Sequence, residues 1–80
     1  MFAEKLENEV KTQIGLTYND MGSSLFQKQK YHDAVTIFNE ALNFMPSDPG
    51  IYINRGDAYR ELKKFNLALS DYHYALDLGG

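Results

Sequence analysis

Residues 48–78 have the sequence DPGIYINRGDAYRELKKFNLALSDYHYALDL, and this stretch decides the fold. Its apolar residues recur at steps of three and four, which is the spacing of one face of an α-helix. Asp48 followed by Pro49 is a typical helix start, because aspartate caps free N–H groups and proline suits the first helical position. The pattern predicts two antiparallel helices joined by a tight turn around Lys63-Lys64.

The same pattern occurs 34 residues earlier in the chain. The residues that are identical at this offset are Tyr18 and Tyr52, Gly22 and Gly56, Lys30 and Lys64, Ala34 and Ala68, Ala41 and Ala75, and Leu42 and Leu76. All of these except the lysines are packing positions of the predicted helices. Since small residues let two helix axes approach closely, we expect Gly22 to face Ala34 and Gly56 to face Ala68.

A long first helix is expected from residue 2 to about residue 28. Its apolar stripe begins with Phe2, Leu6, Val10 and Ile14 and continues into the repeated pattern without a proline. Gly15 lies inside it and costs about 1 kcal/mol relative to alanine, so the helix is expected to continue there with some fraying or bending.

Two further helices are expected at about residues 32–44 and 49–62, and a last one from the Asn66 cap to about residue 78. Asn66 is the expected N-cap of the last one, because asparagine is among the preferred capping residues. The sequence therefore predicts an all-α fold, built from two antiparallel helical hairpins.

This skeleton resembles the tetratricopeptide repeat, whose unit is a 34-residue helical hairpin. The resemblance implies a short α-solenoid with one unit at residues 15–48, a second at 49–80, and an N-terminal helical extension at 1–14. Arg55 departs from the pattern, because the first unit has the apolar Met21 at that place. We expect the second hairpin to be less buried there, or the arginine stem to lie along the surface. Because such arrays usually contain about three units or more, we expect the chain to be a fragment of a longer array.

Composition and charge exclude several classes of function. The chain has 80 residues, a formal net charge of -3 and no cysteine. Without a basic segment it offers little to a phosphate backbone, so nucleic-acid binding is not expected. Charged residues near the N-terminus argue against a signal peptide, and the apolar runs are too short for a membrane span. We expect an intracellular, cytoplasmic protein that does not bind membranes.

The resemblance implies a binding function, since proteins of this family hold peptides or other proteins in a groove lined by the first helix of each hairpin. The groove positions in this chain are Asn19, Ser23, Phe26, Gln27, Ile53, Asn54, Asp57 and Arg60. Phe26 and Ile53 would contact an apolar side chain, and the asparagines would hydrogen-bond an extended backbone. The alternative is that these are ordinary solvated positions on helices.

A co-chaperone-like role is tested by a more specific comparison. Family members that bind acidic C-terminal tails of heat-shock chaperones use a lysine, an arginine and asparagines. Here Asn19 stands at the lysine position and Ser23 at an asparagine position, and only Asn54 agrees. Without cations the charge-assisted bonds are lost, so strong binding of acidic tails is not expected.

A second hypothesis is self-association as a structural or assembly element. The last helix is apolar over most of its circumference, and exposed apolar faces of helices tend to be covered by a partner. The residues of this self-association face are Leu69, Tyr72, Tyr74, Leu76 and Leu78. A homodimer, or the remainder of a longer repeat array, would cover them.

Catalytic and metal-binding patterns are not evident in the sequence. His32 and His73 belong to different hairpins and lack a ligand at the usual helical spacing, so no metal is expected. Ser23 and Ser24 have no histidine and acid beside them in the predicted arrangement. We therefore expect neither an enzyme nor a cofactor, but a scaffold that binds proteins or peptides.

Overall fold

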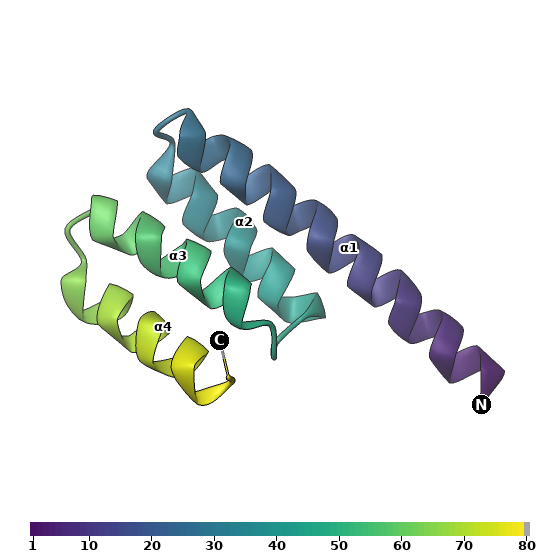
Figure 1. Ribbon diagram of the computed structural model, residues 1–80. Helices are drawn as coiled ribbons and strands as arrows, with labels where there is room; N and C mark the ends of the chain where they lie inside the picture. The colour runs from purple at the N-terminus through teal and green to yellow at the C-terminus, as the bar shows by residue number, and fades with distance from the viewer. Residues whose placement is uncertain (80) are drawn as a thin grey trace.

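The computed structural model describes residues 1–79, and these form four α-helices in two hairpins (Figure 1). Their bounds are Phe2–Gln27 for α1, Tyr31–Phe44 for α2, Pro49–Glu61 for α3 and Phe65–Asp77 for α4. Consecutive helices pack against one another, so the molecule is a slab measuring 44 × 27 × 14 Å. The prediction of an all-α fold of stacked hairpins is confirmed. The domain division stays a prediction, and Gly80 at its end lies outside the described residues.

Helix α1 is continuous through Gly15, so the expected fraying is not seen there. A Cβ atom added to Gly15 would collide with the side chain of Met45, which shows that this methionine lies directly over the glycine. The first part of α1 projects beyond α2, and residues 1–14 are all exposed (Figure 1). The apolar stripe that begins at Phe2 is therefore open to solvent along this extension.

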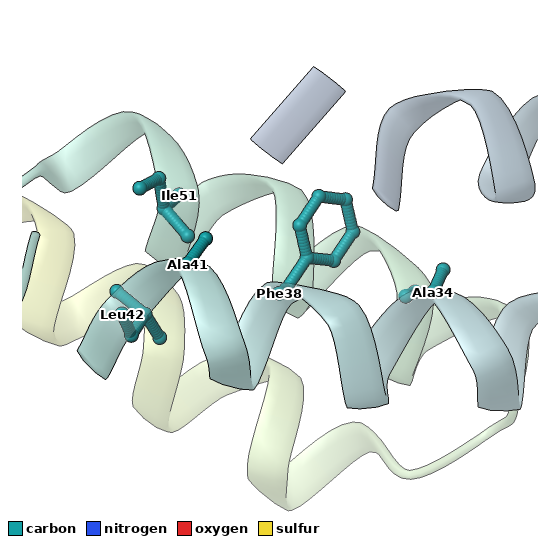
Figure 2. Close-up of a cluster of buried hydrophobic side chains, with 6 residues drawn as sticks. Ala34, Phe38, Ala41, Leu42 and Ile51 are labelled. Atoms are coloured by element: carbon teal, nitrogen blue, oxygen red, sulfur yellow. The ribbon is translucent and has the colours of Figure 1, made fainter. Parts of the chain in front are cut away.

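The core lies between the two hairpins. Ala34, Phe38, Ala41 and Leu42 follow one side of α2, and Ile51 of α3 lies against them (Figure 2). Phe38 and Ile51 are the largest side chains that are fully buried. Burying such a side chain contributes about 1.5–3 kcal/mol, so this small cluster supplies much of what holds the hairpins together.

The glycines allow neighbouring helices to pack closely, but the residue nearest to Gly22 is not the one that was expected. A Cβ at Gly22 would lie 2.5 Å from Cε1 of Phe38, so the nearest neighbour of Gly22 is this ring and not Ala34. A Cβ at Gly56 would lie 2.8 Å from the Tyr72 ring and 3.3 Å from the carbonyl oxygen of Ala68. Ala68 is thus close to Gly56 as predicted, although the Tyr72 ring is closer still.

Both hairpin turns follow the same backbone path. In the second turn, the N–H of Lys64 donates to the carbonyl of Tyr59 and that of Lys63 to the carbonyl of Arg60. This is the Schellman arrangement, in which the residue after the C-cap adopts a left-handed conformation; Lys63 does so with φ of 63°. Lys64 then serves as the N-cap of α4, so the prediction that Asn66 caps this helix is wrong.

Helix α3 begins as the sequence predicts. The carboxylate of Asp48 accepts a hydrogen bond of 2.8 Å from the N–H of Gly50, and Pro49 occupies the first position of the helix. The Tyr52 hydroxyl donates to the carbonyl of Pro46 across the same connection. These bonds set the angle at which the second hairpin follows the first.

Candidate functional site

The first helices of the two hairpins form a hollow between them. It has a volume of about 220 Å³ and is lined by Ser23, Phe26, Gln27, Phe38, Asn54 and Asp57. We call it the α1/α3 hollow. Five of these six residues were predicted groove positions. The sixth, Phe38, was not among the predicted groove positions; its side chain is buried, yet it contributes to the lining.

A side-chain hydrogen bond joins the two walls of the hollow. Nδ2 of Asn54 donates to Oδ1 of Asn19 over 2.9 Å, which connects α3 to α1. Each amide still has groups to offer, because an asparagine side chain has two N–H donors and an acceptor oxygen. The two asparagines therefore fix the spacing of the helices and keep some capacity to bind an extended backbone.

Asp57 is held in place from the opposite side by α4. The hydroxyl of Tyr72 donates to its Oδ1 over 2.6 Å. Burial raises the pKa of Tyr72 to about 12, and the hydrogen bond and negative charge of Asp57 add to the effect. The phenol thus stays protonated and keeps the Asp57 carboxylate oriented at the edge of the hollow.

Arg60 supplies a cation next to the hollow but shares it between two carboxylates. Its Nη1 lies 3.7 Å from Oδ1 of Asp57, and its Nε lies 3.8 Å from Oε2 of Glu61. About half of the Arg60 side chain is exposed, so these contacts contribute little to stability. Their effect is to neutralise one of the two negative charges on this part of α3.

Ile53 was predicted as a groove residue, but it lines a separate depression. This depression is bounded by Ile53, Tyr72, Ala75 and Leu76, and we call it the α4 face. It includes Tyr72 and Leu76 of the predicted self-association face. In the rest of that set, Leu69 and Tyr74 are exposed, whereas Leu78 is half-buried.

Arg55 was expected to make the second hairpin less buried at this place or to lie along the surface, but it is half-buried, less exposed than Met21 of the first hairpin, and forms an ion pair between helices. Its Nε and Nη2 bind the two carboxylate oxygens of Asp71 over 2.9 and 2.7 Å, and its Nη1 donates to Oδ1 of Asn39. The guanidinium also lies 5.5 and 5.7 Å from the ring centres of Tyr52 and Tyr59. The group connects α2, α3 and α4, and its location away from the hollow indicates a structural role.

The expected absence of metal and membrane binding rests on the sequence, and the structure adds two observations. Within residues 1–79, His, Asp and Glu side chains nowhere gather in threes as a metal site requires. In the same range, every helix is too short or too polar to span a bilayer. His32 on α2 and His73 on α4 are both exposed.

Comparison with known proteins agrees with this geometry. A family model described as TPR repeat matches residues 22–63, and one described as Tetratricopeptide repeat matches residues 49–78. The chain belongs to the tetratricopeptide repeat family. It is 35% identical over 75 residues to human Tetratricopeptide repeat protein 16, covering 94% of this chain and 9% of that protein.

A further relative and a solved structure have names that refer to heat-shock proteins. Over 82 residues the chain is 33% identical to Hsp70-Hsp90 organizing protein 2 of Arabidopsis thaliana, covering 95% of this chain and 14% of that protein. A solved structure, the first TPR of Spaghetti (RPAP3) bound to the HSP90 peptide SRMEEVD, superposes with a TM-score of 0.82 at 33% identity. The superposed region covers 84% of this chain and 53% of the RPAP3 chain. The chain thus spans only about a tenth of the length of the curated relatives it matches.

Proposed function

We propose that this chain is a protein-interaction module whose α1/α3 hollow receives a peptide or helix of a partner protein. The observation that carries the proposal is the lining of the hollow, which combines the aromatic ring of Phe26 with polar groups of Ser23, Gln27, Asn54 and Asp57. Such a lining can contact a short apolar side chain through the aromatic ring and can form hydrogen bonds with the backbone on either side of that residue. That the related RPAP3 domain is bound to a peptide supports the same use of this fold.

The partner of this chain need not be the acidic tail seen with that relative. The first hairpin has Asn19 and Ser23 where the family's tail-binding members have a lysine and an asparagine. Removing a cation from a carboxylate site removes its strongest hydrogen bonds. We therefore expect SRMEEVD to bind with a dissociation constant of about 1 mM or weaker, which corresponds to about -4 kcal/mol.

Chemical-shift mapping tests the proposal directly. Isotope-labelled protein is titrated with a pool of heptapeptides that have leucine or phenylalanine at the centre and random flanks, and separately with SRMEEVD. The pool is expected to shift the signals of Ser23, Gln27 and Asn54, and Phe26→Ala is expected to weaken this binding. Shifts spread evenly over the surface, or micromolar binding of SRMEEVD, would contradict the respective parts of the proposal.

A second candidate function, assembly through the α4 face, is favoured by the exposure of Leu76. This residue is 66% exposed, whereas Leu42, its counterpart 34 residues earlier, is 8% exposed because α3 covers it. The same titration separates the two functions. If self-association operates, signals around Ile53 and Leu76 shift with protein concentration in the absence of peptide, and Leu76→Asp abolishes that shift while leaving peptide binding intact.

A further inference from the structure

The lining of the α1/α3 hollow is uncharged except for one carboxylate. Ser23, Phe26, Gln27, Phe38 and Asn54 are uncharged, and the remaining lining residue is the carboxylate Asp57. The asparagine of α1 that faces this wall, Asn19, is hydrogen-bonded to Asn54 and is also neutral. The lining therefore presents negative charge to whatever enters it.

The Asp57 carboxylate is positioned and still accessible. About a third of its side chain is exposed, and its contacts with the Tyr72 hydroxyl and the Arg60 guanidinium both use Oδ1. A carboxylate has a second oxygen that can accept hydrogen bonds from another cation. The tyrosine bond keeps that oxygen in a fixed direction, which lowers the entropy lost when a ligand pairs with it.

The neighbouring cation does not reverse this charge. Arg60 lies within 4 Å of both Asp57 and Glu61, so these three side chains together carry one net negative charge. A carboxylate ligand at the hollow would have to compete with Asp57 and Glu61 for a single guanidinium. A cationic ligand meets a carboxylate that is only partly neutralised.

We propose that the α1/α3 hollow selects peptides in which a lysine or arginine adjoins an apolar residue, and that Asp57 is the residue that sets this preference. The cation pairs with Asp57 while the apolar side chain contacts the ring of Phe26. This inference rests on the proposed function and names the chemistry of the partner. Since a partly exposed ion pair contributes up to about 1 kcal/mol, a basic peptide should bind about fivefold more tightly than a neutral one.

Three matched peptides test the preference, each acetylated at the N-terminus and amidated at the C-terminus: GSKLKSG, GSQLQSG and GSELESG. They share the central leucine and differ only in the charge beside it. Titration calorimetry at low salt should give the order basic, neutral, acidic, with about tenfold or more between the ends. The difference should shrink at high salt, because screening weakens partly exposed ion pairs.

Two variants, each of which removes one negative charge, test whether Asp57 causes the preference for basic peptides. Asp57→Asn keeps an oxygen for the Tyr72 hydroxyl and should bring the basic and acidic peptides to within about twofold of each other. Asp77→Asn makes the same change of net charge at the exposed end of α4 and should preserve the original ratio. Thermal unfolding of both variants checks that the fold is retained.

Each outcome is decisive. Equal binding of basic and acidic peptides, while the neutral one binds, would overturn the charge preference and leave the proposed function standing. A preference that persists in Asp57→Asn and weakens in Asp77→Asn would show that overall charge, and not Asp57, causes it. If none of the peptides bound at millimolar concentration, the proposed function itself would fail, and the preference with it.

Discussion

Replacing Arg55 by methionine should destabilise the protein strongly, because it leaves Asp71 without its partner. The Asp71 side chain is 7% exposed and its carboxylate receives both of its side-chain hydrogen bonds from Arg55. Breaking a buried ion pair by removing one partner costs about 3–5 kcal/mol. Arg55 itself is 21% exposed, so water can partly replace it, and we expect a loss at the lower end, about 3 kcal/mol.

The loss is large relative to the stability of a domain of this size. Domains are typically stable by about 5–15 kcal/mol, and for chains of 60–100 residues each kcal/mol corresponds to roughly 4–8 °C in melting temperature. Arg55→Met should therefore lower the melting temperature by about 12 °C or more. Urea denaturation followed by circular dichroism would measure the change in the free energy of unfolding.

The first hairpin of this chain suggests a double variant that should restore the lost stability. The residues 34 positions before Arg55 and Asp71 are Met21 and Ile37, an apolar pair at the equivalent places of the first hairpin. Replacing a buried ion pair by apolar residues of similar volume is often neutral or stabilising. The double variant Arg55→Met/Asp71→Ile should thus recover most of the loss and come within about 1 kcal/mol of the wild type, despite losing the contacts with Asn39 and the two tyrosine rings.

A control variant and the stability of the double variant test whether the unpaired charge of Asp71 causes the loss. Arg60→Met removes the same type of side chain from exposed ion pairs and should cost less than about 1 kcal/mol. If the double variant were as unstable as Arg55→Met, the interaction between Arg55 and Asp71 would itself stabilise the fold. The reasoning that the single variant suffers from an unpaired buried charge would then be wrong.

Two further predictions concern close packing and titration. Gly22→Ala should destabilise the protein by about 1–3 kcal/mol in urea denaturation, since the new methyl group collides with the buried Phe38 ring, whereas Gly15→Ala meets a flexible methionine and should be nearly neutral; equal losses would contradict this. Tyr72, with its pKa raised to about 12, should contribute a transition near pH 12 to an absorbance titration that is missing in Tyr72→Phe, and Asp57→Asn should lower its pKa. Because the folded state keeps this proton where the unfolded state releases it, stability should fall as pH rises from about 10 to about 12. A Tyr72 transition near pH 10 would exclude this coupling.

The helices, their order and their pairing follow from the sequence by itself. Apolar spacing, the Asp48-Pro49 start and the 34-residue offset are local or periodic signals, and a helix responds to them wherever it lies. The resemblance to the tetratricopeptide repeat, and not these signals alone, indicated Ser23, Phe26 and Asn54 as groove positions, and all three line the α1/α3 hollow. The start of α4 was misjudged because the hydrogen bonds of the preceding turn, and not the preference of Asn66, determine where that helix begins.

Tertiary structure decided which side chains meet. The pairs Asn19–Asn54 and Arg55–Asp71 are 35 and 16 residues apart, and no local propensity indicates that they touch. Likewise, Ile53 lies on the α4 face although its position in the repeat predicted the groove. The rotation of a helix about its own axis is set by how its neighbours pack, which one helix's sequence does not contain. The hydrophobic pattern determines that these helices form and associate, and packing alone determines the polar contacts between them.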